Sequence, residues 1–213
     1  LSFLAAFDAG DRVALACPGY PAYRNILAAL GIQVVDIPVD KETNFQPTSA
    51  ILDNLQSSTG VRLDGLVIAS PSNPTGTMLK TEDLHDLSLY CEKHGIRLIS
   101  DEIYHGITYD LPAQTALAFS RQSIVINSFS KYFSMTGWRL GWLVVPEDLL
   151  RAVECLAQNL FISPPTVSQV AATAVFDCHE ELQANVRRYA CNREILLSTL
   201  PRAGLQELAA SDG

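Results

Sequence analysis

Six short apolar runs alternate with helix-like stretches along this chain, and this alternation restricts the fold more than any other feature. The runs lie at residues 12–17, 33–39, 65–69, 96–100, 123–127 and 140–145. Helical patterns occupy intervals between them, at 23–30, 48–55 and 81–94. Strands separated by helices form βαβ units, which place successive strands parallel in one sheet. We therefore predict an α/β fold with a mainly parallel sheet.

The most apolar run, at 65–69, indicates that helices sandwich the sheet, because a strand with one face in water alternates apolar and polar residues. After Pro146 the pattern changes, and helical stretches follow one another at 146–160, 166–179 and 180–200. We predict a large domain at 1–150 and, at 151–213, a helical continuation toward a smaller domain. Since the chain starts at Leu1 inside an apolar stretch and stops at Gly213 without a closing element, we expect it to be incomplete at both ends.

Charge and cysteine content narrow the function classes. Fifteen Lys and Arg residues stand against 23 Asp and Glu residues, a net charge of −8, which argues against nucleic-acid partners and anionic membrane surfaces. No apolar stretch approaches the roughly 20 residues of a membrane span. Five scattered cysteines without a Cys-x-x-Cys pair predict free thiols in a reducing compartment, and hence a cytoplasmic protein. The four histidines make no metal-spaced pair, so we predict no metal site.

Polar side chains of different chemistry follow three of the predicted strands. Ligands of open α/β sheets bind outside the carboxyl ends of the strands, so we expect these side chains to share a pocket. In chain order they are Asn73 after the run 65–69, Asp101 and Tyr104 after 96–100, and Ser128, Ser130 and Lys131 after 123–127, with Arg139 eight residues beyond Lys131.

This inventory suits a phosphorylated aromatic aldehyde. A lysine amine can bind the aldehyde covalently. A carboxylate keeps a heterocyclic nitrogen protonated, a phenol and an amide hydrogen-bond a ring oxygen, and a guanidinium with hydroxyls binds the phosphate. The sequence therefore predicts pyridoxal 5′-phosphate (PLP) as the cofactor.

Three motifs in this order resemble the class I/II aminotransferases of PLP fold type I. They are Ser-Asn-Pro-Thr-Gly at 72–76, Asp-Glu-Ile-Tyr at 101–104, and Ser-Phe-Ser-Lys followed by Thr-Gly-Trp-Arg-Leu-Gly within 128–141. The resemblance covers essentially the whole chain. It implies a seven-stranded-type sheet in the large domain.

The resemblance also implies roles for the catalytic residues. Lys131 would form the Schiff base with the cofactor and would then move the proton between substrate Cα and cofactor C4′. Asp101 would pair with the ring nitrogen. Tyr104 and Asn73 would hold the ring oxygen, and the Asn73–Pro74 bond is expected to be cis, as in family members.

The remaining implied roles concern the phosphate and the ring face. Ser128 and Arg139 would hold the phosphate, with Ser130 as a weaker candidate. The segment Pro-Gly-Tyr-Pro-x-Tyr at 18–23 is similar to the family segment that lays an aromatic ring over the cofactor, and we assign that role to Tyr20.

The implied activity is transfer of an amino group from an L-amino acid to a 2-oxo acid by a ping-pong mechanism, in a homodimer. Two family features lie outside this chain: a phosphate loop expected upstream of Leu1, and a carboxylate-binding arginine expected well beyond residue 213. We therefore leave open whether this piece is active alone.

Other functions stay open. Residues 128–131 also match the Ser-x-x-Lys motif of serine β-lactamases and penicillin-binding proteins, although the companion motifs Ser-Asp-Asn and Lys-Thr-Gly are missing. A PLP enzyme with another reaction, such as a C–S lyase, decarboxylase or cyclopropane-forming synthase, would show almost the same site. A non-catalytic effector-binding domain of a regulator is a further alternative.

Overall fold

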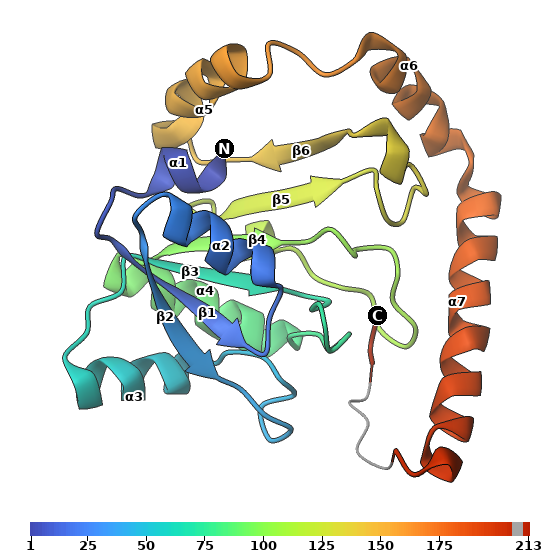
Figure 1. Ribbon diagram of the computed structural model, residues 1–213, viewed down its shortest axis with the longest axis horizontal. Coiled ribbons are helices and arrows are strands. Elements are labelled where there is room, and N and C mark those ends of the chain that lie inside the picture. Colours follow the sequence, from blue (N-terminus) through green and yellow to red (C-terminus); the bar gives the residue numbers. More distant parts are fainter. Residues whose placement is uncertain (206–210) are drawn as a thin grey trace.

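The computed structural model describes residues 1–205 and 211–213. One sheet runs through it in the strand order β2-β1-β3-β4-β5-β6, parallel throughout except for β6, which is antiparallel to β5 (Figure 1). The strands are β1 (Arg12–Cys17), β2 (Gln33–Pro38), β3 (Gly65–Ala69), β4 (Arg97–Asp101), β5 (Ile124–Ser128) and β6 (Gly141–Val144). The predicted α/β class and mainly parallel sheet are confirmed.

The sheet of the described residues has six strands, whereas the resemblance implied a seven-stranded type. Each of the six apolar runs supplies one of these strands. The helices are α1 (Ser2–Ala6), α2 (Pro21–Ala29), α3 (Ser49–Thr59), α4 (Thr81–His94), α5 (Glu147–Leu160), α6 (Thr166–Ala174) and α7 (His179–Thr199).

Alternate residues of each strand pack into two separate cores, one on each face of the sheet, because successive side chains of a strand point to opposite faces. Val67 and Ile99 pack on the face covered by α1 and α2, where Leu27 of α2 is fully buried. Leu66 and Leu98 pack on the opposite face, covered by α3 and α4. Burial on both faces explains why the central strands are almost wholly apolar.

The last three helices pack less tightly than the sheet domain. Figure 1 shows α5 beside α1, and α7 along the side toward which the parallel strands point. Only Leu182 and Val186 of the 21 residues of α7 are buried. Gln183 of α7 still donates a hydrogen bond of 2.9 Å to the hydroxyl of Tyr132, next to Lys131. No helix within the described ranges is long and apolar enough to cross a membrane.

Candidate active site

The carboxyl ends of β3, β4 and β5 meet at one edge of the sheet. Ala69 is paired with Asp101 across β3 and β4, and Asp101 with Ile126 across β4 and β5. Strands in this register end at about the same height, so the residues that follow them are neighbours. The predicted convergence of polar residues at this edge agrees with the sheet topology.

Asp101, the last residue of β4, faces the side covered by α2. The hydroxyl of Tyr23 in α2 donates a hydrogen bond of 2.5 Å to Asp101 Oδ2, and the backbone N–H of Ile103 donates one of 3.1 Å to Oδ1. Burial raises the pKa of the Asp101 carboxyl, while these two hydrogen bonds and the nearby His105 oppose that rise. The site thus contains a half-buried carboxyl group that a cationic partner would stabilise as the carboxylate.

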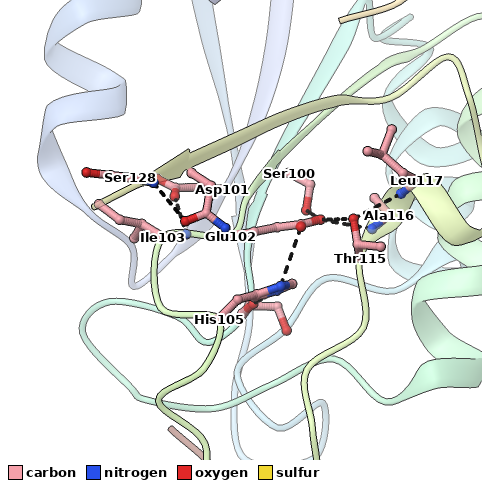
Figure 2. Close-up of polar contacts among 11 residues, drawn as sticks. Ser100, Asp101, Glu102, Ile103, His105, Thr115, Ala116, Leu117 and Ser128 are labelled. Atoms are coloured by element: carbon pink, nitrogen blue, oxygen red, sulfur yellow. Dashed lines mark hydrogen bonds and ion pairs between the residues drawn. The ribbon is translucent and has the colours of Figure 1, made fainter. Parts of the chain in front are cut away.

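Glu102 points to the opposite face, as Figure 2 shows, and its side chain is almost fully enclosed at 3% exposure. Three groups donate to its Oε1 atom: the Ser100 hydroxyl at 3.1 Å, the Thr115 hydroxyl at 3.0 Å and the Ala116 backbone N–H at 2.9 Å. Its Oε2 atom lies 3.4 Å from His105 Nδ1, and His105 Nε2 lies 3.0 Å from the Ser70 carbonyl oxygen. This network ties the loop after β4 to the loop after β3, which carries Asn73.

Lys131 lies in the turn that follows β5, and its Nζ atom is 5.5 Å from the centre of the Tyr104 ring. The structure therefore brings together two of the predicted catalytic residues from neighbouring strand ends. The turn is fixed by backbone hydrogen bonds from Ser134 to the Lys131 carbonyl (2.9 Å) and from Met135 to the Phe129 carbonyl (3.0 Å). These bonds fix the main chain from which the Lys131 side chain extends.

The predicted phosphate-binding residues form a linked group. Ser128 Oγ lies 2.8 Å from Ser130 Oγ and 3.1 Å from the Leu140 carbonyl oxygen, next to Arg139. Arg139 donates to the Thr136 carbonyl at 2.9 Å, and the Thr136 hydroxyl donates to the Ser130 carbonyl at 2.5 Å. Arg139 has a φ of 53°, an uncommon conformation for a residue with a side chain, and such conformations cluster at functional sites.

Asn73 and Tyr20 line a cavity of about 230 Å³, which Tyr23 also lines. The Tyr20 ring meets the Tyr23 ring edge-on, with centroids 5.4 Å apart and planes at 79°. Tyr20 is 43% exposed, so part of the residue is accessible to a ligand. Asn73 also lines a second hollow with Tyr104, and the Asn73–Pro74 bond is cis, as expected.

Sequence reasoning missed two residues of this region, Tyr23 and Glu102. Tyr23 stands three residues after Tyr20 at the start of α2, a spacing that places two side chains on the same side of a helical turn. That spacing could have identified the pair. Glu102 carried a weaker signal, because the alternation of a strand shows only that it points away from Asp101.

The donor set suits PLP. A primary amine, a half-buried carboxylate, two phenols, an amide, paired hydroxyls and a guanidinium lie along one edge of the sheet. Asp101 supplies the most specific argument, since a carboxylate whose charge is disfavoured by burial gains from a protonated ring nitrogen. The residues present therefore fit the cofactor.

Ser128 ends a strand, and Lys131 follows it in a turn. In serine β-lactamases and penicillin-binding proteins the two motif residues share a helical turn, so this geometry disfavours that alternative.

The chain is similar in sequence to known proteins along its whole length. All of residues 1–213 match the family described as Aminotransferase class I and II. The chain is 52% identical to a valine–pyruvate aminotransferase of Mycobacterium tuberculosis, with 100% of this chain and 55% of that protein covered. It is 32% identical to a (5-formylfuran-3-yl)methyl phosphate transaminase of Methanocaldococcus jannaschii, with 89% and 49% covered. The chain thus spans about half the length of these curated relatives.

Solved structures give the same result. An aminotransferase from Mycobacterium tuberculosis superposes with a TM-score of 0.94 at 51% identity, covering 100% of this chain and 55% of that chain. A putative aminotransferase from Silicibacter pomeroyi gives 0.92 at 52% identity, covering 100% and 56%. Together with the match over the full sequence, these likenesses confirm the resemblance inferred from the motifs: the chain belongs to the class I and II aminotransferases.

Proposed function

We propose that the protein containing this chain is a PLP-dependent aminotransferase, which moves an amino group from an L-amino acid to a 2-oxo acid. One observation carries the proposal within this family: the Lys131 amine lies 5.5 Å from the Tyr104 ring at the strand edge that also holds the half-buried Asp101. An amine beside a phenol, with a carboxylate at the end of the neighbouring strand, is the arrangement that this chemistry requires.

The residues that would hold the cofactor are those of the strand edge. Asp101 would face the ring nitrogen, Tyr104 and Asn73 the ring oxygen, and Tyr20 the ring face. Ser128 and Arg139 would bind the phosphate. When bound, PLP supplies an electron sink that acidifies the Cα–H bond of the amino acid.

Lys131 would be the general base of the reaction. Its Nζ atom would take the proton from substrate Cα and deliver it to C4′ of the cofactor during amino transfer. Tyr104, below the same amine, would restrict where that amine can reach. Because the amino group is stored between the two half-reactions, the enzyme would follow ping-pong kinetics.

Valine and pyruvate are the substrate pair we propose to test first. The support is the 52% identity to a valine–pyruvate aminotransferase over the whole of this chain. Other relatives are aspartate aminotransferases at about 30% identity, for example 31% for that of Geobacillus stearothermophilus, so aspartate is the competing donor.

We also propose a cytoplasmic homodimer with a domain boundary near residue 150. All five cysteines are free thiols, which supports a reducing compartment.

Apolar side chains are exposed from the end of α5 into α6, including Phe161 at 62%, Ile162 at 85% and Val167 at 71%. Exposed apolar surface of this kind favours a protein partner, here a second copy of the chain. Light scattering of the purified protein tests the dimer, and a monomer would contradict it.

The activity is tested with the full-length protein that carries this chain. We expect it to bind PLP with a new absorbance band and to convert valine and pyruvate into alanine and 2-oxoisovalerate. Lys131→Ala should abolish turnover, whereas Lys93→Ala, at an exposed position in the last turn of α4, should not. Turnover by Lys131→Ala near the unmodified rate would overturn the proposal. Release of CO₂ with formation of an amine would point to a decarboxylase, and release of a thiol or sulfide together with ammonia from a sulfur-containing amino acid would point to a C–S lyase.

A further inference from the structure

We propose that Tyr23 is a positioning residue, whose hydroxyl fixes the Asp101 carboxylate as an ionised acceptor that faces the cofactor ring. The inference rests on the proposed function, since it gives Tyr23 a role through Asp101. The role goes beyond the motif analysis, in which only Tyr20 of the segment 18–23 received a function.

Tyr23 reaches Asp101 from a rigid support. It stands in the first turn of α2, which begins at Pro21. Leu27, one turn further along, is fully buried in the core beneath this helix, and Tyr23 packs against the same core. A side chain carried on a packed helix holds its direction, so the 2.5 Å hydrogen bond to Asp101 Oδ2 is a constraint on the carboxylate.

The carboxylate is oriented by two donors, one on each oxygen. Ile103 N–H donates to Oδ1 from the chain that follows β4, and Tyr23 donates to Oδ2 from the helix above the sheet. Two donors on separate oxygens fix the plane of the group. Each also favours the ionised form, because hydrogen bonds to a carboxylate stabilise its charge.

The Tyr23 hydroxyl is suited to donate at every working pH. Burial and the Asp101 carboxylate raise the pKa of Tyr23 far above its usual range, so the phenol stays protonated. Besides Asp101, the titratable groups that influence Tyr23 are Tyr20 and Tyr104; besides Tyr23, the one that influences Asp101 is His105. Without the Tyr23 donor, burial would dominate, and the pKa of Asp101 would rise further.

The same ring connects two assigned residues. Tyr23 donates to Asp101 and meets Tyr20 edge-on at 5.4 Å. A ligand ring that lies on Tyr20 and pairs with Asp101 would therefore make two contacts, and the Tyr23 side chain positions the protein partner in each of them. This double contact separates Tyr23 from tyrosines that merely fill the core.

The test compares Tyr23→Phe with Tyr90→Phe in the PLP-loaded full-length protein. Tyr90 is a matched control on α4, because its hydroxyl also lies near a carboxylate, 3.5 Å from Asp53 Oδ1, and accepts from Gln56 at 2.8 Å. The kcat and KM of the amino-acid half-reaction are measured against pH. The absorbance of bound PLP is titrated against pH without substrate.

For Tyr23→Phe we expect kcat to fall about 10-fold near pH 6.5, since one hydrogen bond to a charged group is lost, with KM for the amino acid within about two-fold. Both the acidic limb of the kcat profile and the absorbance midpoint should move to higher pH. Tyr90→Phe should match the unmodified protein. A double-mutant cycle compares how Tyr23→Phe changes PLP affinity in the unmodified protein and in Asp101→Asn. The change should vanish in the Asp101→Asn background.

Three results would overturn the inference. These are an unshifted pH profile, an equal loss of kcat at every pH together with a lower melting temperature of the cofactor-free protein, and additive effects in the cycle. The last two would mean that Tyr23 acts through packing. If Tyr23→Phe does not fold, fluorotyrosine at position 23, a stronger donor, should shift both midpoints to lower pH, and no shift would count against the role. If the unmodified protein neither binds PLP nor transfers an amino group, the proposed function itself fails, a result distinct from these three.

Discussion

Two adjacent carboxylates at the end of β4 have opposite environments. Asp101 faces α2 with one donor on each oxygen, whereas Glu102 faces the other side and is enclosed by Ser100, Thr115, Ala116 and His105. Figure 2 shows the two side chains pointing apart. Both are carboxyl groups at least partly withdrawn from solvent, so burial alone does not identify a catalytic carboxylate. The lesson is that the groups surrounding each acid separate a structural role from a functional one.

The largest expected effect comes from removing Asp101, the first of these two carboxylates. Asp101→Ala should lower the rate of amino transfer by several orders of magnitude, about 10³-fold or more, because the ring nitrogen would lose its anionic partner. PLP should still bind, since Ser128, Arg139 and Lys131 remain. Stopped-flow absorbance of the half-reaction with valine measures the rate. A loss below ten-fold would mean that Asp101 is a structural acid like its neighbour.

Glu102→Gln tests the other side of the comparison. The amide oxygen can still accept from the three donors to Oε1, but the NH₂ group replaces Oε2, the acceptor that lies 3.4 Å from His105 Nδ1, so we expect a loss of about 2–4 kcal/mol in the free energy of unfolding. The rate per folded, PLP-loaded molecule should change by less than about ten-fold. Urea unfolding and active-site titration separate the two quantities. A stable but inactive variant would reverse the assignment.

Arg139→Ala should have a smaller effect, confined to the cofactor. Removal of the guanidinium should weaken PLP binding by about 10- to 100-fold, as expected for one charge-assisted phosphate contact. Arg151→Ala is the control, because Arg151 lies on α5 in an exposed pair with Glu154. Equilibrium dialysis measures the affinity. Unchanged affinity in Arg139→Ala would remove Arg139 from the phosphate site.

The smallest predicted effect concerns stability and pH in the cofactor-free protein. The pKa of Asp101 is raised in the folded state, so its contribution favours the fold at low pH and is lost as pH rises through the raised value. Above that pH, Asp101→Asn should therefore be more stable than the unmodified protein, by about 0.5–1 kcal/mol. Melting curves at pH 4 and pH 8 check the sign. An Asn variant that is less stable at pH 8 would contradict it.

Much of the fold could be predicted because the apolar runs are sharply bounded. The runs at 12–17 and 65–69 coincide with β1 and β3, and the other strands differ by one or two residues at their ends. The predicted helix at 166–179 instead breaks after Ala174 into a 3₁₀ turn at Val175–Asp177. Strand periodicity is local and strong, while the end of a helix depends on tertiary packing.

The candidate site could be located by sequence, but its supporting contacts could not. Polar residues after strands indicated Asp101 and Lys131, since parallel strands end at a common edge. The Tyr23–Asp101 hydrogen bond joins residues 78 apart, and Thr115 reaches Glu102 from a loop. No periodicity encodes such partners, which arise only when the sheet order places α2 over β4.

The central claim is that Lys131 is the residue that binds the cofactor covalently. The chain has four lysines, Lys41, Lys80, Lys93 and Lys131, so the claim can be tested by location. The PLP-loaded protein would be treated with borohydride, digested and analysed by mass spectrometry. We predict the reduced cofactor mass on the peptide that contains Lys131 and on no other lysine peptide of this chain. The mass on Lys41, Lys80 or Lys93, or on none of the four, would contradict it.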